Sequence, residues 1–219
     1  MTQLSFSEIW YWFLVMAVVS YFIGCFNFAL VISRFKHKDV RKMGSGNPGT
    51  MNMSRQFGLK IGAITLFCDM VKAGIPVLAG YFIFRGCVFA GTDVLVSDLA
   101  RYVCGVFVIV GHIYPVTMKF KGGKGILSGG VVAIMIDWRI AVVVWGGFLI
   151  LTALTRYVSL GSLWAGASFP FISWYCYPQT PIIVLAFCLG GLIVWKHRAN
   201  IQRLLAGNEN KLSFHRKKT

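Results

Sequence analysis

The stretch IWYWFLVMAVVSYFIGCFNFALVIS, residues Ile9–Ser33, decides the fold class of this chain. It contains no Asp, Glu, Lys or Arg, and as an α-helix it would extend about 37 Å at 1.5 Å per residue. The hydrocarbon core of a bilayer is about 30 Å thick, so the stretch predicts a membrane-spanning helix. It follows an N-terminus without Lys or Arg and is longer than the apolar part of a signal peptide, so we expect a retained span.

The rest of the chain repeats this pattern of long apolar runs separated by short polar stretches. Of its 219 residues, 57% are hydrophobic and 13% are charged, which is about half the charged fraction of a typical soluble domain. We predict further spans at about 61–84, 102–118, 125–136, 138–154, 158–175 and 180–195. The expected fold is an all-α integral membrane protein, a seven-transmembrane helix bundle that forms a single domain over residues 1–219.

Basic residues indicate the orientation of the bundle. Of the 22 Lys and Arg residues, only Arg85, Arg101 and Arg139 lie on one side, and Lys72 lies inside a span. All others lie in the stretches 34–60 and 119–124, at Arg156, and from Lys196 onward. The positive-inside rule therefore places the N-terminus outside and the C-terminus in the cytoplasm.

The net charge of +15 comes from residues that flank apolar runs, which favours contact with the lipid bilayer over binding of nucleic acid. The six cysteines show no metal-binding or redox spacing, and the seven Asp and Glu residues form no sequence cluster. We therefore expect no nucleic-acid partner, no metal and no cofactor.

The first cytoplasmic stretch contains Gly44-Ser45-Gly46-Asn47-Pro48-Gly49, followed by Asn52 and Arg55. Its glycine spacing matches a dinucleotide-binding fingerprint, but the residues before it are mostly charged and do not predict the strand which that motif requires. Glycine backbone amides with Ser45 and Asn47 could bind an anion, and Arg55 could clamp phosphate oxygens. A flexible turn is the alternative for this stretch taken alone.

His112 lies in the cytoplasmic half of the third span, which leads into Phe120-Lys121-Gly122-Gly123-Lys124-Gly125. Two lysines among three glycines combine cations with accessible backbone donors, which suits a highly charged phosphate. The sequence of a Walker A loop is absent. A lone histidine in a span is commonly satisfied by a neighbouring helix, so His112 has a structural alternative.

Three other groups of residues carry candidate functions. Ser159 and Ser162 would share a face in the first turn of the sixth span, where N–H groups favour anions, although ordinary helix capping is the alternative. His197 and Asn200, three residues apart, could close a site or lie on a basic surface helix. Asp69 and Lys72 lie within the second span at a spacing that predicts a structural ion pair.

Together these motifs resemble those of the acyl-phosphate:glycerol-3-phosphate acyltransferases, a family of bacterial integral membrane enzymes. The resemblance extends from about Gly24 to Lys211 and rests on five motifs in order. They begin at Gly44, Asp69, Gly111, Arg156 and His197. The chain departs from the family pattern at Thr50-Met51, at Ala73 and at Gly161, without breaking the order of the motifs.

The resemblance implies transfer of a fatty acyl group from acyl-phosphate to the sn-1 hydroxyl of glycerol 3-phosphate. The products would be 1-acyl-glycerol 3-phosphate (lysophosphatidic acid) and phosphate, in phospholipid biosynthesis. Residues expected to bind acyl-phosphate are those of the loop Gly44, Ser45, Gly46 and Asn47, together with Gly122, Gly123 and Lys124. Residues expected to bind glycerol 3-phosphate are Arg55, Ser162, His197 and Asn200, supported by Ser159 and Asn52.

For the chemistry, the catalytic candidates are Lys124, Ser45, His112 and His197. We favour a substrate-assisted route in which a substrate phosphate takes the hydroxyl proton while Lys124 and backbone donors stabilise the oxyanion. The alternative has His112 or His197 as general base.

The resemblance also implies a place in the cell and a set of partners. The enzyme would be a multi-pass protein of the bacterial plasma (inner) membrane, with its active site facing the cytoplasm and a functional link to an enzyme that makes acyl-phosphate. The main rival function is an organic-phosphate membrane transporter. Such proteins usually contain internal repeats, and none is found in this sequence.

Overall fold

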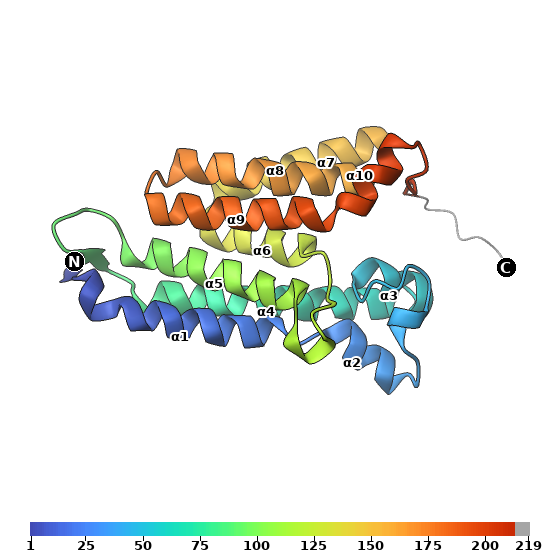
Figure 1. Cartoon of the computed structure of the whole chain (residues 1–219), viewed down its shortest axis with the longest axis horizontal. Helices are drawn as coiled ribbons and strands as arrows, with labels where there is room; N and C mark the ends of the chain where they lie inside the picture. Colours follow the sequence, from blue (N-terminus) through green and yellow to red (C-terminus); the bar gives the residue numbers. More distant parts are fainter. Residues whose placement is uncertain (213–219) are drawn as a thin grey trace. The chain divides into compact units, whose positions relative to one another are not determined.

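The computed structural model describes residues 1–212, and these residues are almost entirely α-helical (Figure 1). They form two compact units, which meet in the sequence between Ile136 and Asp137. Both units are built mainly of apolar helices, as predicted for an all-α integral membrane protein. The single domain expected over residues 1–219 stays a prediction.

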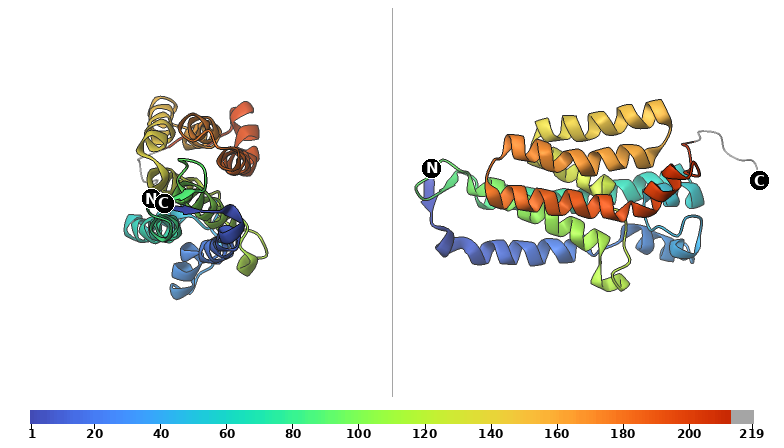
Figure 2. Two further views of the ribbon diagram at one scale, coloured as in Figure 1. Left: turned by 90° about the vertical axis from the view of Figure 1, so that its left-hand side faces the viewer. Right: turned by 45° about the horizontal axis from the view of Figure 1, so that its top comes forward.

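The first unit contains β1 (Thr2–Leu4), α1 (Phe6–Gly24), α2 (Phe28–Phe35), the 3₁₀ helix η1 (Val40–Lys42), α3 (Thr50–Phe57), α4 (Leu59–Ile83), β2 (Cys87–Phe89), α5 (Val96–Ile113), the 3₁₀ helix η2 (Val116–Met118) and α6 (Ile126–Ile136). The second unit contains α7 (Trp138–Thr155), α8 (Val158–Cys176), α9 (Thr180–Lys196) and α10 (Arg198–Leu205). Figure 2 shows α7, α8 and α9 lying side by side.

Within residues 1–212, four segments are long and apolar enough to cross a membrane, or five if the bent pair α9–α10 counts as one span. The four are Phe6–Phe35, Leu59–Ile83, Val96–Met118 and Trp138–Thr155. The predicted number of seven is not reached on length and hydropathy. The 11 residues of α6 would extend only about 16 Å, and α8 contains several serines that lower its hydropathy.

Close approach between α1 and α5 organises the first unit. A Cβ atom at Gly24 would lie 2.1 Å from the carbonyl oxygen of Val108, and one at Gly111 would lie 2.0 Å from that of Tyr21. Both helices therefore need glycine where their backbones touch, as is common for helices packed within a membrane. The Tyr21 hydroxyl also donates to the Tyr114 carbonyl at 3.0 Å, beyond the end of α5.

The second unit uses the same device. A Cβ at Gly161 would lie 2.6 Å from the Phe148 carbonyl oxygen of α7, and one at Gly190 would lie 2.6 Å from the Gly166 carbonyl oxygen of α8. Gly161, one of the departures from the family pattern, thus permits close packing of α7 and α8. On α7, the apolar side chains of Val142, Leu149 and Leu154 remain exposed, as expected for a surface that faces lipid.

A short parallel pairing of β1 with β2 joins the N-terminus to the segment between α4 and α5. Thr2 pairs with Cys87, Gln3 with Val88 and Leu4 with Phe89. The sequence analysis did not predict this pairing, because three-residue strands carry too little periodicity to be recognised.

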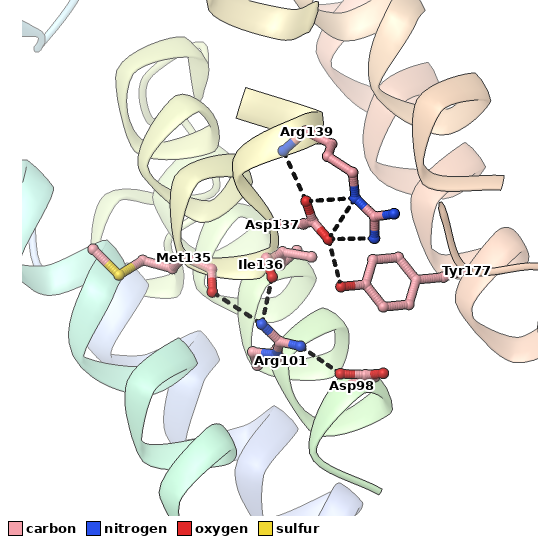
Figure 3. A network of polar contacts seen from close by, with 7 residues as sticks. All are labelled: Asp98, Arg101, Met135, Ile136, Asp137, Arg139 and Tyr177. Atoms are coloured by element: carbon pink, nitrogen blue, oxygen red, sulfur yellow. Dashed lines mark hydrogen bonds and ion pairs between the residues drawn. The ribbon is translucent and has the colours of Figure 1, made fainter. Parts of the chain in front are cut away.

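Arg101, in the second turn of α5, joins α5 to the end of α6 (Figure 3). Arg101 forms an ion pair with Asp98 and donates to the carbonyls of Ile136 and Met135, the latter at 3.4 Å. These two carbonyls belong to the last turn of α6, where no intrahelical donor is available. Arg101 therefore caps α6 at its C-terminal end.

A second polar network, within the second unit, surrounds Asp137 at the start of α7 (Figure 3). Its carboxylate accepts hydrogen bonds from Arg139 at 2.7 Å and from the Tyr177 hydroxyl at 2.9 Å. The hydrogen bonds from Arg139, which outweigh the opposing effect of burial, lower the pKa of Asp137 to about 2. Arg101 and Arg139, two of the three basic residues predicted on the outer side, are thus paired with carboxylates.

Candidate active site

The stretch after η1 folds into a compact loop whose shape is held by the buried side chain of Asn52, in the first turn of α3. Its Nδ2 donates to the carbonyls of Val40 at 3.2 Å and Met43 at 3.0 Å, and its Oδ1 accepts from the Ser45 amide at 3.3 Å. Asn52 was expected to support binding of glycerol 3-phosphate. Its contacts favour a role in shaping the loop instead.

Glycine is required where this loop turns. Gly44 has φ +55° and Gly46 has φ +70°, a left-handed conformation that side chains disfavour. A Cβ at Gly44 would also lie 2.4 Å from Asn52 Oδ1. These two glycines therefore allow the chain to wrap closely around the Asn52 amide.

Most backbone amides of the loop are used within it, unlike the expectation that they bind an anion. Gly46 donates to the Met43 carbonyl at 2.9 Å, Gly49 donates to the Asn47 carbonyl at 2.9 Å, and Asn47 donates to Ser45 Oγ at 3.4 Å. The Ser45 hydroxyl is exposed and, because it accepts from Asn47, keeps its own proton to donate. The groups left as candidate anion donors at this loop are therefore the Ser45 hydroxyl, the Asn47 side chain and the first-turn N–H groups of α3.

Arg55 is exposed on α3, three residues beyond Asn52. Among residues 1–212 its side chain forms no hydrogen bond or ion pair. An uncommitted guanidinium one turn from a glycine-rich loop can bind two phosphate oxygens at once.

The lysine–glycine loop is bound to the end of α5. The amide of Gly122 donates to the Ile113 carbonyl and that of Gly123 to the His112 carbonyl, both at 3.1 Å. The backbone donors expected at these glycines are therefore engaged by the protein, and the glycines act as close-packing positions. The N–H groups at the start of α6, after Gly125, take their place as candidate anion donors because a first helical turn has no internal acceptors for them.

His112 and Gly123 lie against each other. His112 is 7% exposed, and a Cβ at Gly123 would lie 2.2 Å from its Nε2 atom. Lys124 is half-buried, whereas Lys121 is exposed. The structure thus brings His112, Gly122, Gly123 and Lys124 together at the C-terminal end of α5.

In the second unit, the segment after α10 folds back over the start of α8. The Leu212 amide donates to the Arg156 carbonyl at 2.7 Å, and the Lys211 ammonium lies over the Tyr157 ring, 5.5 Å from its centroid. This fold brings Glu209 to Asn200 and Arg203, whose side chains donate to its carboxylate at 2.9 Å and 2.7 Å.

Glu209 is a further candidate site residue, which was not among those expected from the sequence. Burial raises the pKa of its carboxyl group, but the donors on Asn200 and Arg203, with a smaller contribution from Ser159, hold that pKa below its usual value. Glu209 therefore stays ionised and joins the segment after α10 to Asn200 and Arg203 of that helix. The available signal was its place in the last motif, in a chain with only seven acidic residues.

Ser162 and His197 are buried near the same ends of α8 and α9. Ser162 Oγ donates to the Val158 carbonyl of its own helix at 2.9 Å. The Nδ1 atom of His197 lies 2.8 Å from the Ile193 carbonyl, which can only accept, so Nδ1 carries a proton. His197 marks a bend of 52° between α9 and α10, and Nε2 is the nitrogen that can act as a base.

Asp69 and Lys72 form the expected ion pair inside α4. Lys72 Nζ lies 2.8 Å from Asp69 Oδ1, and both side chains are buried. Lys72 also donates to the Phe26 carbonyl at 2.8 Å. Within residues 1–212, no group of three or more His, Cys, Asp or Glu side chains is arranged to hold a metal ion.

Comparison with known proteins places these motifs in a family. The family profile described as glycerol-3-phosphate acyltransferase matches residues 14–207. The glycerol-3-phosphate acyltransferase of Thermoanaerobacter pseudethanolicus is 34% identical over 197 residues, which cover 90% of this chain and 93% of that protein. The enzyme of the same description from Methylobacillus flagellatus is 36% identical over 200 residues, covering 89% and 94%.

Two solved structures are similar to the whole arrangement. Both are of PlsY (YgiH), an integral membrane glycerol 3-phosphate acyltransferase, one in its glycerol 3-phosphate form and one in its lysophosphatidic acid form. Each is 30% identical, with TM-scores of 0.80 and 0.78, and they cover 92% of this chain and 96% and 95% of theirs. This chain belongs to the glycerol-3-phosphate acyltransferase family.

Proposed function

We propose that this enzyme takes its acyl group from acyl-phosphate and transfers it to the sn-1 hydroxyl of glycerol 3-phosphate. The supporting observation is that the first unit has two separate glycine-rich loops, each leading into a helix N-terminus. One combines Ser45 and Asn47 with α3, and the other combines Lys124 with α6. Both loops are assigned to the phosphate of the acyl donor, and a thioester donor would leave them without a phosphate at its reacting end.

We assign the acyl-phosphate headgroup to Ser45, Gly46, Asn47 and Lys124. In this assignment Gly122 and Gly123 hold the loop Phe120–Gly125, here called the lysine loop, against α5. Asn52 holds the shape of the loop Gly44–Gly49, here called the serine loop. Arg55, Ser162, His197 and Asn200 bind glycerol 3-phosphate, with Ser159 in support. Glu209 orients Asn200 for binding of glycerol 3-phosphate. Its carboxylate accepts a hydrogen bond from the Asn200 side-chain amide nitrogen, which fixes the direction in which the amide oxygen points.

In the proposed reaction, the sn-1 oxygen attacks the acyl carbonyl carbon and forms a C–O bond. The resulting oxyanion is stabilised by Lys124 and N–H donors, then collapses and breaks the bond from carbon to the phosphate oxygen. The proton of the sn-1 hydroxyl moves to a phosphate oxygen of the substrate. The products are 1-acyl-glycerol 3-phosphate, that is lysophosphatidic acid, and inorganic phosphate.

The competing base is a histidine, and the geometry bears differently on the two candidates. His112 is buried against Gly123, beside the lysine loop. His197 is held by the Ile193 carbonyl with Nε2 as its basic nitrogen. Substrate assistance remains our proposal because acyl-phosphate is an activated donor with a good leaving group, so the attacking hydroxyl does not require a strong base.

We also propose the seven-span topology in a bacterial plasma membrane, with the N-terminus outside and the C-terminus in the cytoplasm. The short connections from α7 to α8 and from α8 to α9 support it, because antiparallel neighbours packed along a spanning helix must themselves cross. The charge difference supports the orientation. Arg216, Lys217 and Lys218, which contribute to it, lie outside the described residues.

The direct test is acyl transfer by purified protein in lipid, with labelled glycerol 3-phosphate and acyl-phosphate, acyl-CoA or acyl-carrier protein as donor. Labelled lysophosphatidic acid from acyl-phosphate alone is the expected result, and it would imply a functional link to an enzyme that makes acyl-phosphate. Product from a thioester alone would overturn the donor. Uptake of glycerol 3-phosphate into sealed vesicles without product would favour the organic-phosphate transporter.

A further inference from the structure

The first span is broken between α1 and α2, and the break leaves backbone carbonyls that side chains from elsewhere satisfy. α1 ends at Gly24 and α2 begins at Phe28. The Cys25 carbonyl accepts from Thr117 Oγ1 at 3.0 Å, and the Phe26 carbonyl accepts from Lys72 Nζ at 2.8 Å. Each donor comes from a different element, Thr117 from η2 and Lys72 from α4.

The next residue, Asn27, connects the break to the serine loop. Its Oδ1 accepts from the Leu30 amide at 2.8 Å and so caps α2, while its Nδ2 donates to the Pro48 carbonyl at 3.3 Å. Asn27 is 7% exposed. Pro48 directly follows Asn47, so this hydrogen bond holds the loop that carries Ser45 and Asn47 to the end of the broken helix.

Thr117 makes the matching connection on the other side. It lies in η2, a few residues before Lys121, and its hydroxyl binds the residue next to the one that Lys72 binds. The break is therefore connected to both glycine-rich loops, directly through Asn27 and by way of η2 through Thr117. Lys72, paired with Asp69, fixes the break from within the span.

We propose that Asn27, Thr117 and Lys72 are positioning residues, which use the break between α1 and α2 to fix the serine loop and the lysine loop relative to each other. If Lys72 served only to neutralise Asp69, it would need no carbonyl contact 46 residues away in the chain. An unsatisfied carbonyl within a membrane protein is costly, so the break keeps its conformation only while these donors remain. The expected change in KM rests on the proposed function, but the expected change in the conformation of the two loops does not.

Three variants test this connection between the helix break and the two loops. Asn27→Ser keeps a residue that caps helices well but removes the donor to Pro48. Asp69→Asn/Lys72→Met removes both charges together, so no unpaired buried charge remains, and deletes the donor to Phe26. Thr117→Val removes the donor to Cys25. Thr65→Val is the matched control, because buried Thr65 lies on the same helix as Lys72 and donates only to the Ile61 carbonyl of its own helix.

Hydrogen–deuterium exchange of the peptide covering residues 43–49, in nanodiscs and without substrate, is the first readout. We expect faster exchange in Asn27→Ser and Asp69→Asn/Lys72→Met, with Thr65→Val close to wild type. The second readout is steady-state kinetics: the KM for acyl-phosphate should rise roughly three- to tenfold in Asn27→Ser, as for loss of one hydrogen bond, with a smaller change in kcat. Thr117→Val should affect exchange of residues 119–125 instead.

Wild-type exchange and wild-type KM in both Asn27→Ser and Asp69→Asn/Lys72→Met would overturn the proposal. So would an equal effect of the control Thr65→Val, because that would indicate general loosening. If the double variant does not fold, Asn27→Ser and Thr117→Val still decide the question. If the wild type uses another acyl donor, the donor assignment fails, while the exchange measurement still tests the connection.

Discussion

Replacing Gly123 with alanine tests the packing of the lysine loop against α5. The new Cβ would lie 2.2 Å from His112 Nε2 and 3.0 Å from Cε1. Such contacts do not occur, so either the buried His112 ring or the loop must move by about 1 Å. Overpacking of this kind costs about 1–3 kcal/mol, and movement of the loop would also weaken the hydrogen bond from the Gly123 amide to the His112 carbonyl.

If that energy is needed to hold Lys124 in its working position, kcat/KM for acyl-phosphate falls by about 5- to 150-fold. The assay is steady-state acyl transfer in lipid, and the control is Gly146→Ala, because a Cβ at Gly146 meets nothing within 4 Å. In a His112→Ala background the clash has no partner, so Gly123→Ala should then cost less than twofold. Equal effects of Gly123→Ala in both backgrounds would refute the reasoning.

Three further predictions concern acid–base behaviour and stability. The folded-state pKa of Glu209 lies below its ordinary value of 4.5, so Glu209 stabilises the protein fully above pH 4.5 and this stabilisation is lost as the pH falls through the folded-state pKa. Glu209→Gln should lower the melting temperature at pH 7 by about 2–4 °C and flatten the decline of the melting temperature below pH 4.5. An unchanged pH dependence of the melting temperature would contradict this. With substrate assistance, His112→Gln and His197→Gln should lower the rate without removing a limb of the pH–rate profile, whereas loss of one limb with one histidine would identify that histidine as the base. Arg101→Lys should destabilise the protein by about 1.5–3 kcal/mol in thermal unfolding, because the single ammonium of lysine cannot span Asp98 and the α6 carbonyls as the two Nη atoms of Arg101 do. An unchanged unfolding temperature would exclude the capping role.

The parts of the fold that follow from apolar run length were predictable. The helical class and the membrane location follow from uninterrupted apolar runs such as Ile9–Ser33, and the Asp69–Lys72 pair follows from its helical spacing. The break at Cys25–Asn27 was not visible, because the run stays apolar through it and only one polar residue, Asn27, marks the place. Hydropathy averages over a window and cannot register a helix break of three residues.

At the site, the residue types were predictable but several of their roles were not. Glycines at 44, 46, 122 and 123 indicated exposed backbone donors, whereas at 46, 122 and 123 the amides bind carbonyls of the protein. Asn52 resembled a ligand-binding side chain, yet its three hydrogen bonds shape the loop. Such assignments depend on contacts between residues distant in sequence, as does the pairing of Glu209 with Asn200 and Arg203.

The central claim is that the acyl group arrives on phosphate, and the most direct measurement is the stoichiometry of the products. Purified protein in lipid would be given acyl-phosphate and labelled glycerol 3-phosphate, and inorganic phosphate and lysophosphatidic acid would be measured in the same samples over time. The account predicts one phosphate released for each lysophosphatidic acid formed, with no phosphate release when glycerol 3-phosphate is omitted. Phosphate release without lysophosphatidic acid, or lysophosphatidic acid formed only when an acyl thioester is supplied, would contradict it.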